Sequence, residues 1–190
     1  MGELIVAVDP VSGLATGVVD KDVAHREGLW HATIHVWILD RDGRVLLQQR
    51  SPSKETFPGL WDISAAGHIR PGEDGRREVE EELGVRVRAD QLEQIGILTI
   101  DQDLPGLRNR ERPRVHLWRS DLTLSDFTFP DGEVVALAGV SLSQLAALRE
   151  GAGVTAQVWR DGALTSETVE GAAVVPFGQA YWDALLTYLS

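Results

Sequence analysis

The sequence predicts an α+β sandwich, in which helices cover a β-sheet. Most segments in the first 140 residues have the composition of strands, and the helical segments between them follow no regular strand–helix alternation. The chain has 190 residues, of which 43% are hydrophobic and 25% are charged. These proportions are typical of a soluble globular protein, and the length suffices for one buried core.

Runs of apolar, β-branched and aromatic residues bounded by Gly, Pro and Asp predict the strands. Residues 30–39 return through a tight Asp- and Gly-containing turn and form a hairpin with residues 45–49. Alternation within the first of these strands places His31, Thr33 and His35 on one face and the even-numbered residues on the other. A polar, arginine-rich loop separates the fifth and sixth predicted strands. The predicted strands are residues 4–8, 30–39, 45–49, 60–66, 94–100, 115–122 and 134–140.

Three segments have helical patterns. Residues 76–83 form a strongly acidic helix that Gly84 ends, and residues 143–149 carry leucines at helical spacing. The last helix starts at Pro176, and between these two helices residues 154–169 read as an added hairpin. The recurring apolar residues of the last helix are Phe177, Tyr181, Leu185 and Tyr188.

Charge and composition exclude several functional classes. Eighteen Lys and Arg against 29 Asp and Glu give a net charge of −11, which disfavours sequence-independent binding to nucleic acid. An anionic small molecule would need a local basic patch or a bound metal. The chain has no cysteine, so it has no disulfide, thiolate zinc site or cysteine nucleophile. No apolar run approaches the roughly 18 residues of a membrane span. The N-terminus has no basic signal-peptide region, so we expect a cytoplasmic protein.

The acidic helix carries the strongest chemical signal. Glu78, Glu81 and Glu82 are three and four residues apart, so their carboxylates project from one helical face. Neighbouring carboxylates repel each other unless a cation neutralises them, and carboxylate oxygens are the ligands that Mg²⁺ or Mn²⁺ prefers. Arg77 can reach along the helix and fix the rotamers of the glutamates. Glu73, on the preceding loop, could add a ligand or a base.

This segment resembles the Nudix box, the signature of a superfamily of diphosphate hydrolases. The resemblance implies that Glu78, Glu81 and Glu82 bind Mg²⁺ or Mn²⁺, helped by the main-chain carbonyl near Gly67. It also implies that Arg77 orients the glutamates rather than touching the substrate. The matching residues are Gly67, Glu73, Arg77, Glu78, Val79, Glu81, Glu82, Gly84 and Val85.

The box departs from the family pattern in one place. Three residues separate Glu73 from Arg77, whereas the family has seven. Four residues are about one helical turn, so the three glutamates keep their facing. Either the loop is tighter or the helix starts later. The departure bears on the role of Glu73 more than on the helix.

Residues 31–37 and 46–64 resemble the Nudix branch related to type 1 isopentenyl-diphosphate isomerase. This resemblance implies that Lys21, Arg50 and Lys54 grip a substrate diphosphate, and three cations in an acidic chain are a plausible anchor for one. The alternative for each is an ordinary surface salt bridge. The resemblance also makes three histidines candidate metal ligands, although a lone histidine is more often structural. These histidines are His25, His31 and His68.

The isomerase chemistry itself should be absent. The catalytic cysteine of the isomerases falls where this chain has Ala65-Ala66, and Asn109 stands where they have an acidic ligand, although Glu111 is kept. The complete Arg-Glu-x-x-Glu-Glu helix, in turn, is a hydrolase feature. We therefore give more weight to the helix.

The resemblance covers about residues 1–145 and implies a Nudix α/β/α sandwich with a mixed sheet. We expect a single domain over residues 1–190 with a core at about 30–145. The C-terminal elaboration comprises an added hairpin within 150–172 and a helix at 176–189; it would cap the site or form a dimer contact.

The resulting hypothesis is a Mg²⁺-dependent pyrophosphohydrolase acting on a nucleoside diphosphate derivative or related small molecule. Glu78 or a distal glutamate, Glu133 or Glu111, would accept the proton of the attacking water. Two alternatives stay open: a weakened Nudix fold that binds a diphosphate ligand, and an isomerase-like protein without the thiol. No motif specifies the substrate, and a homodimer is a fair expectation at this size. Aromatic residues that could stack on a base, or else belong to the core, are Trp30, Trp37 and Trp118.

Overall fold

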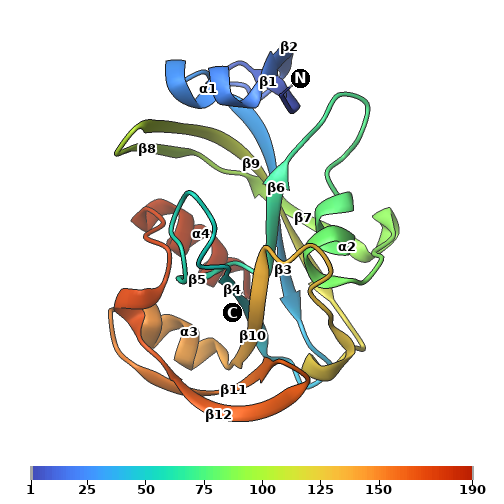
Figure 1. Ribbon diagram of the computed structural model, residues 1–190, viewed down its shortest axis with the longest axis vertical. Coiled ribbons are helices and arrows are strands. Elements are labelled where there is room, and N and C mark those ends of the chain that lie inside the picture. Colours follow the sequence, from blue (N-terminus) through green and yellow to red (C-terminus); the bar gives the residue numbers. More distant parts are fainter. Residues whose placement is uncertain (1, 190) are drawn as a thin grey trace.

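The computed structural model describes residues 2–189, which form one 12-stranded sheet with helices on both sides (Figure 1). Met1 and Ser190, the ends of the expected domain, lie outside the described residues. The helices are α1 (Lys21–Glu27), α2 (Arg77–Leu83), α3 (Leu142–Arg149) and α4 (Gln179–Leu189). The strands are β1 (Leu4–Val8), β2 (Ala15–Asp20), β3 (His31–Leu39), β4 (Val45–Arg50), β5 (Trp61–Asp62), β6 (Ala65–His68), β7 (Leu92–Ile97), β8 (Ile100–Leu104), β9 (Leu107–Arg119), β10 (Val134–Val140), β11 (Val154–Arg160) and β12 (Ala163–Val169).

Strand β3 is the centre of the sheet. Along one edge it pairs in parallel with β9 over its full length, and along the other it pairs in succession with β1, β6 and β4, all antiparallel. The sheet is therefore mixed, as the family resemblance implies. Every residue of β3 is buried, because protein covers both faces of this strand.

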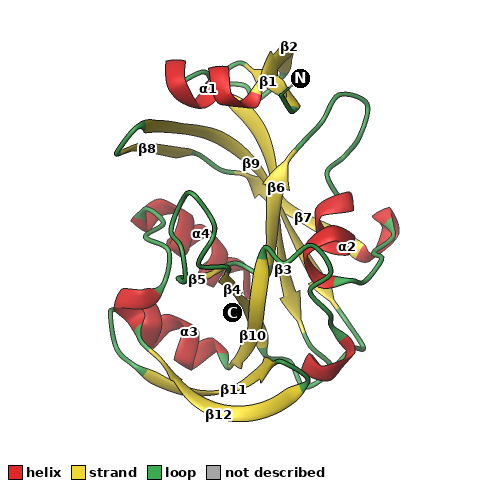
Figure 2. Cartoon of the chain, viewed as in Figure 1, coloured by secondary structure: helices red, strands yellow, loops and turns green. Residues whose placement is uncertain are grey.

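Two hydrophobic clusters fill the layers on either side of β3. The even-numbered residues, among them Ile34 and Val36, pack with Val79 and Leu83 of α2. On the opposite face, Trp37 and Leu39 pack with residues of α3 and α4. Figure 2 shows α2 on one side of the sheet and α3 with α4 on the other. The predicted α/β/α sandwich is confirmed, and so is the predicted division of β3 into two faces.

Several predicted elements are found at or near their expected positions. Strands β1 and β10 match the prediction, and α2 begins at Arg77 and ends before Gly84, which adopts the left-handed conformation. Residues 154–169 form the β11–β12 hairpin, paired from Val154↔Val169 to Arg160↔Ala163. Helix α2 follows the shortened loop directly, with Arg76 as its N-cap residue.

Other predictions were wrong in part. The predicted hairpin of β3 with β4 does form, but the two strands pair only at Leu39 and Val45, because β6 and β1 take the rest of that edge of β3. Residues 60–66 form two short strands that pair with different neighbours, β5 with β4 and β6 with β3.

The boundaries of the remaining elements also differ. The arginine-rich loop is largely the first half of β9, because its arginines and the residues between them pair through the main chain with β8 and β3. Residues 94–100 are divided between β7 and β8. The last helix begins at Gln179 rather than at Pro176. The sequence patterns did not predict β2 and α1, because both segments are short and carry few apolar residues.

Gly84 ends α2 where the helix packs against the loop that contains Thr128. Its φ is +70°, and a Cβ there would lie 1.9 Å from the Thr128 hydroxyl oxygen. We expect Gly84→Ala to lower the free energy of unfolding by about 3 kcal/mol, from left-handed strain plus the clash. Gly162→Ala is the matched control, because Gly162 has φ +76° and open space around it, and it should cost only about 1 kcal/mol. Thermal unfolding of both variants measures the difference, and equal losses would contradict the packing argument.

Candidate active site and metal centre

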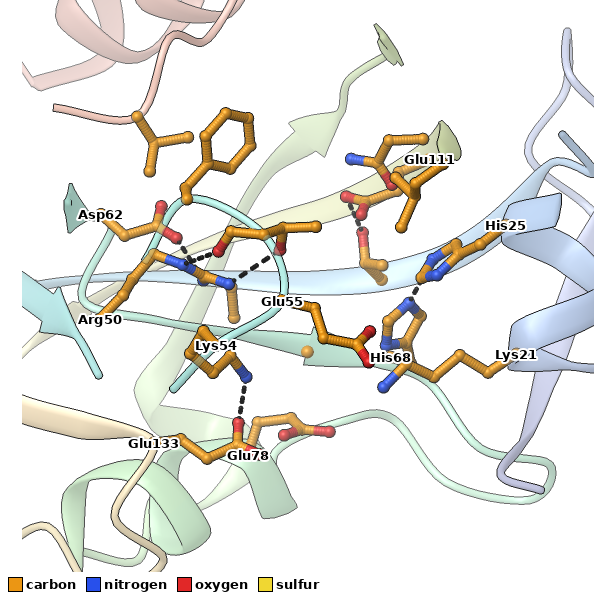
Figure 3. A pocket seen from close by; sticks show the side chains of 18 of the residues that line it. Lys21, His25, Arg50, Lys54, Glu55, Asp62, His68, Glu78, Glu111 and Glu133 are labelled. Carbon is orange, nitrogen blue, oxygen red and sulfur yellow. Dashed lines mark hydrogen bonds and ion pairs between the residues drawn. The ribbon is translucent and has the colours of Figure 1, made fainter. Parts of the chain in front are cut away.

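A cavity of about 620 Å³ opens between the β3–β6 layer, α1, the 51–60 loop and the β8–β9 hairpin. Among the described residues that line it are nine carboxylates (Glu3, Asp22, Glu55, Asp62, Glu78, Glu81, Glu111, Asp131, Glu133) and five Lys and Arg (Lys21, Arg50, Lys54, Arg70, Arg77). Histidines occupy one end, and glutamates from α2 and the 133 region occupy another wall (Figure 3). This acidic excess would repel a diphosphate unless cations intervene.

Glu78 lies directly against the main chain of Gly67. A Cβ at Gly67 would be 2.1 Å from the Glu78 carboxyl carbon, so only glycine lets this carboxylate reach β6. Burial raises the pKa of Glu78 to about 7, and the neighbouring Arg77 only partly opposes this effect. The side chain is 13% exposed and pairs with Arg77 at 2.6 Å. The contact places a carboxylate and a main-chain segment where both could bind one cation.

Glu82 lies one helical turn further along α2 and is almost fully buried. Its Oε2 accepts hydrogen bonds from the Ala66 amide at 3.0 Å and from Gln48 Nε2 at 3.3 Å. Burial raises the pKa of Glu82 well above its usual range, and the nearby Glu78 adds to the rise. An ionised carboxylate at this depth requires a positive partner.

Arg77 holds the acidic groups of the box in place. Its guanidinium contacts Glu73 at 3.0 Å, Glu78 and Glu81, and it donates to the main-chain carbonyl of His68 at 3.2 Å. Glu81 lines the cavity and is partly exposed. Glu73 does not line it, since this carboxylate binds Arg77 and the Arg70 amide. The geometry thus makes Glu73 a partner of Arg77, and a metal-ligand role for it remains a prediction.

The three predicted diphosphate-binding cations all line the cavity, and each is paired. Arg50 makes the most hydrogen bonds of the three. Its guanidinium donates to the Thr56 carbonyl, the Thr56 hydroxyl and Asp62, all at 2.9–3.0 Å. It therefore anchors the 51–60 loop. Lys21 lies 3.5 Å from Glu3, which is a looser contact.

Lys54 pairs with Glu133 across the mouth of the cavity (Figure 3). Glu133 is half-exposed and lies on the wall that carries Glu78. Each partner is accessible to a ligand, unlike Arg50. A bound anion could draw Lys54 away from Glu133 and leave that carboxylate free.

Three histidines converge at the other end of the cavity: His25 and His68 line it, and His31 is buried behind them. His25 is on α1, His31 on β3 and His68 on β6, and one ring nitrogen from each lies within 4.8 Å of the others. His31 Nδ1 lies 2.9 Å from the Leu29 carbonyl, which can only accept, so Nδ1 carries the proton. The buried Nε2 of His31 then presents a lone pair, without a hydrogen-bond partner among the described residues.

The surroundings of His25 and His68 favour the neutral form of these two imidazoles. Burial lowers the pKa of His68 to about 3, and nearby His31 and Lys21 lower it further, although Glu111 opposes them. Burial and the neighbouring His31 likewise lower the pKa of His25. Neutral imidazole nitrogens are metal ligands. The orphaned lone pair and these pKa shifts fit a divalent cation at this cluster.

Glu111 of β9 stands beside the cluster, opposite His31 in the parallel register. Its Oε2 lies 3.7 Å from His35 Nε2 and accepts from the Thr33 hydroxyl at 3.3 Å. Burial alone would raise the pKa of Glu111, but the His35 contact and the surrounding histidines bring it well below its usual range. Glu111 is thus a charged, buried carboxylate, whereas Glu133 is the accessible one.

The sequence reading did not assign a site role to His35, Asp62 or Tyr181. His35 shares the face of His31 and Thr33, and that alternation was the available signal. The three tryptophans considered for base stacking do not line the cavity among the described residues: Trp37 and Trp118 are in the two cores, and Trp30 packs on the second.

Comparison with known proteins identifies the fold and the family. The model of the NUDIX domain matches residues 29–160. An uncharacterised Nudix hydrolase of Clostridium acetobutylicum is 34% identical over 136 residues, which are 68% of this chain and 66% of that protein. An isopentenyl-diphosphate Delta-isomerase of Serratia proteamaculans is 36% identical over 110 residues, 56% of this chain and 59% of that one. This chain therefore covers less than two thirds of the length of each of these two relatives.

Solved structures share the fold. A Deinococcus radiodurans protein, DR0079, superposes with a TM-score of 0.55 at 24% identity, over 76% of this chain and 90% of its own. The MutT protein of Methanosarcina mazei gives a TM-score of 0.52 at 21% identity, over 62% and 81%. In the part of the chain that the structure describes, no helix combines the length and hydrophobicity needed to span a membrane.

The buried glutamates predict an unusual pH dependence of stability. The ordinary carboxyl pKa is 4.5, and in the folded chain that of Glu78 is about 7. Between these values the folded state binds more protons than the unfolded state. In the metal-free protein, the contribution of Glu78 to the free energy of unfolding should therefore be most favourable below about pH 4.5. It should fall as the pH rises to about 7.

Glu82→Gln tests whether buried glutamates cause this pH dependence of stability, because the substitution removes one buried charge. With chelator present, Glu82→Gln should melt higher than the wild type at pH 8 and lose that advantage at pH 5. Glu80→Gln, on the same helix but exposed and paired with Arg86, should change neither. Thermal unfolding at the two pH values is the measurement. A Glu82→Gln protein that melts lower than the wild type at pH 8 would contradict the electrostatic argument.

Gly67→Ala tests the contact between β6 and Glu78. The added Cβ must displace the carboxylate, so we expect Mn²⁺ affinity at the acidic helix to fall by at least ~10-fold while the protein stays folded. Gly17→Ala is the control, because Gly17 is in a strand with open space around it. Calorimetric titration gives the affinity, and unchanged binding by Gly67→Ala would show that Glu78 is not a ligand.

Proposed function

The chain belongs to the Nudix family, and from this premise we propose that it is a divalent-metal-dependent hydrolase that cleaves a diphosphate linkage in a small molecule. The observation that carries the proposal is the position of Glu78 and Glu82. Both carboxylates leave one face of α2 and lie against the main chain of β6, where burial makes them costly without a cation.

We assign the cation-binding groups as Glu78, Glu82 and the Gly67 carbonyl, with Glu81 completing the set from the cavity side. Mg²⁺ and Mn²⁺ prefer such oxygen ligands. When bound there, the cation neutralises the diphosphate and lowers the pKa of a water molecule. The cluster of His25, His31 and His68 with Glu111 supplies a second, nitrogen-rich site.

The other residues of the chain position the substrate and move the proton. Lys54 and Lys21 are the cations accessible to a diphosphate, and Arg50 keeps the 51–60 loop in place. Glu133 is the proposed base, since Lys54 leaves it when an anion binds and its carboxylate then accepts the proton of the attacking water. Arg77 orients the glutamates through three ion pairs.

Two other functions fit this site less well than hydrolysis. Isomerase-like chemistry on an isoprenoid diphosphate lacks its acid, because Ala65 and Ala66 of β6 stand at the thiol position and the chain has no cysteine. A ligand-binding module without turnover is the stronger alternative, because α2 has only seven residues. We propose the soluble cytoplasm as its location and a homodimer as its assembly.

A phosphate-release screen in Mg²⁺ tests the hydrolase. The panel comprises nucleoside diphosphates, nucleotide sugars, dinucleotides and isoprenoid diphosphates, with a phosphomonoesterase added where the products are monoesters. We expect turnover of one group, a loss of at least ~100-fold in kcat for Glu82→Gln, and activity within about twofold of wild type for Glu80→Gln.

The other outcomes are equally informative. A silent panel together with calorimetric binding of Mn²⁺ and a diphosphate would favour the binding module. Equal loss in Glu82→Gln and Glu80→Gln would point to a folding defect. Alkene rearrangement of an isoprenoid diphosphate without phosphate release would replace the hydrolase by an isomerase.

A further inference from the structure

Tyr181, on α4, lies outside the segment that the family model matches, yet it reaches the central strand. Its hydroxyl oxygen is 3.0 Å from Trp37 Nε1 and 2.8 Å from His35 Nδ1, and all three side chains are buried. An indole N–H can only donate, so the hydroxyl accepts from Trp37. The hydroxyl proton is then available to His35 Nδ1.

The opposite nitrogen of the same imidazole faces a carboxylate. His35 Nε2 is 3.7 Å from Glu111 Oε2, and the two side chains are only 5% and 13% exposed. If Nδ1 accepts from Tyr181, a neutral ring carries its proton on Nε2, directed toward Glu111. The reverse tautomer would place two lone pairs face to face and leave the tyrosine proton without this acceptor.

Glu111 depends on few groups for its orientation. Its Oε2 contacts His35 and the Thr33 hydroxyl, and both of these come from the cavity face of β3. The parallel register sets Glu111 opposite His31, and the antiparallel register sets Thr33 opposite His68. The backbone thus brings the carboxylate to the histidine cluster, while His35 and Thr33 determine where it points.

We propose that Tyr181 is a positioning residue for the histidine-cluster cation site: its hydroxyl fixes the Nε2–H tautomer of His35, which holds Glu111 beside His25, His31 and His68. The inference rests on the proposed role of that cluster as a cation site. It assigns a part in the site to the C-terminal helix, through a chain of contacts from α4 to β3 to β9.

The tautomer is measurable in metal-free protein without any enzymatic assay. Long-range ¹H–¹⁵N correlation spectra of histidine-labelled protein distinguish a protonated from an unprotonated ring nitrogen. We expect His35 to show unprotonated Nδ1 and protonated Nε2, and Tyr181→Phe to give a mixture of tautomers. Tyr188→Phe removes a hydroxyl from the same helix, where Tyr188 faces Glu93, and should leave His35 unchanged.

Zn²⁺ titration of the same samples measures the consequence, since imidazole nitrogen is a preferred ligand of Zn²⁺. Direct coordination shifts the ¹⁵N resonance of the ring nitrogen that binds the cation, so the His25 and His68 ring signals report this cluster separately from the glutamate helix. Tyr181→Phe should weaken that binding by about 10–100-fold, the usual effect of losing a group that orients a ligand, and Tyr188→Phe should not.

Three results would overturn the proposal. They are protonated Nδ1 in the wild type, a tautomer that Tyr181→Phe leaves unchanged, and a changed tautomer with unchanged Zn²⁺ affinity. If Zn²⁺ never shifts the ring nitrogens of these histidines in the wild type, the cluster is not a cation site and the proposal fails with it. The hydrolase assignment would still stand or fall separately, on the loss of phosphate release in Glu82→Gln.

Discussion

The full-length parallel pairing of β3 with β9 is the constraint on which the rest of the molecule depends. It fixes the register of nine residue pairs, from His31↔Glu111 to Leu39↔Arg119. Because side chains alternate along a strand, the same pairing puts Thr33 and His35 in the cavity wall, buries His31 beside them, and directs their neighbours into the core beneath α2. A slip by one residue would exchange these two sets. Hydrophobic burial on one face of β3 thereby sets the geometry of the polar groups on the other.

The cost of the site is electrostatic. Glu78 and Glu82 lie where their ionised forms are poorly solvated. Arg77 pairs with Glu78 and partly offsets the desolvation of that carboxylate, which is the more exposed of the two. In a protein selected for stability alone, apolar side chains at these positions would serve better. The main chain of β6 instead approaches α2 through Gly67, and the Ala66 amide donates to Glu82. In the proposed function, a bound cation offsets this electrostatic penalty.

The sequence predicted those parts of the molecule that local patterns determine. The α2 helix follows from the spacing of Val79, Leu83 and the glutamates, and its end follows from Gly84. Strand β9 was misplaced because its polar half pairs with β3 and β8 through main-chain bonds, which leave no hydrophobic signature. The β3–β4 hairpin was overestimated, since adjacency in sequence does not show that β6 takes the same edge.

The residues of the candidate site also differ in whether a local sequence pattern relates them. Arg77, Glu78 and Glu82 belong to one helix, so their mutual facing can be read from spacing alone. The ion pairs of Arg50 and Lys54 depend on Asp62 and Glu133, which only the folded sheet brings near. His35 and Tyr181 are 146 residues apart in the chain, and no local pattern relates them. Long-range polar contacts are therefore the part of a site that sequence patterns describe least.

The shortened loop before α2 need not abolish the function of the box. Removing about one turn from the start of a helix shifts its first residue but leaves the direction of later side chains unchanged. The helix begins without a side-chain cap at Arg76, yet Arg77 ties this end to Glu73 and to the His68 carbonyl of β6. Those bonds replace the missing turn as the link between helix and sheet. Glu78 and Glu82 consequently meet β6 at Gly67 and Ala66, as the proposed cation site requires. The loop length therefore weighs less against hydrolysis than the intact contacts of α2 weigh in its favour.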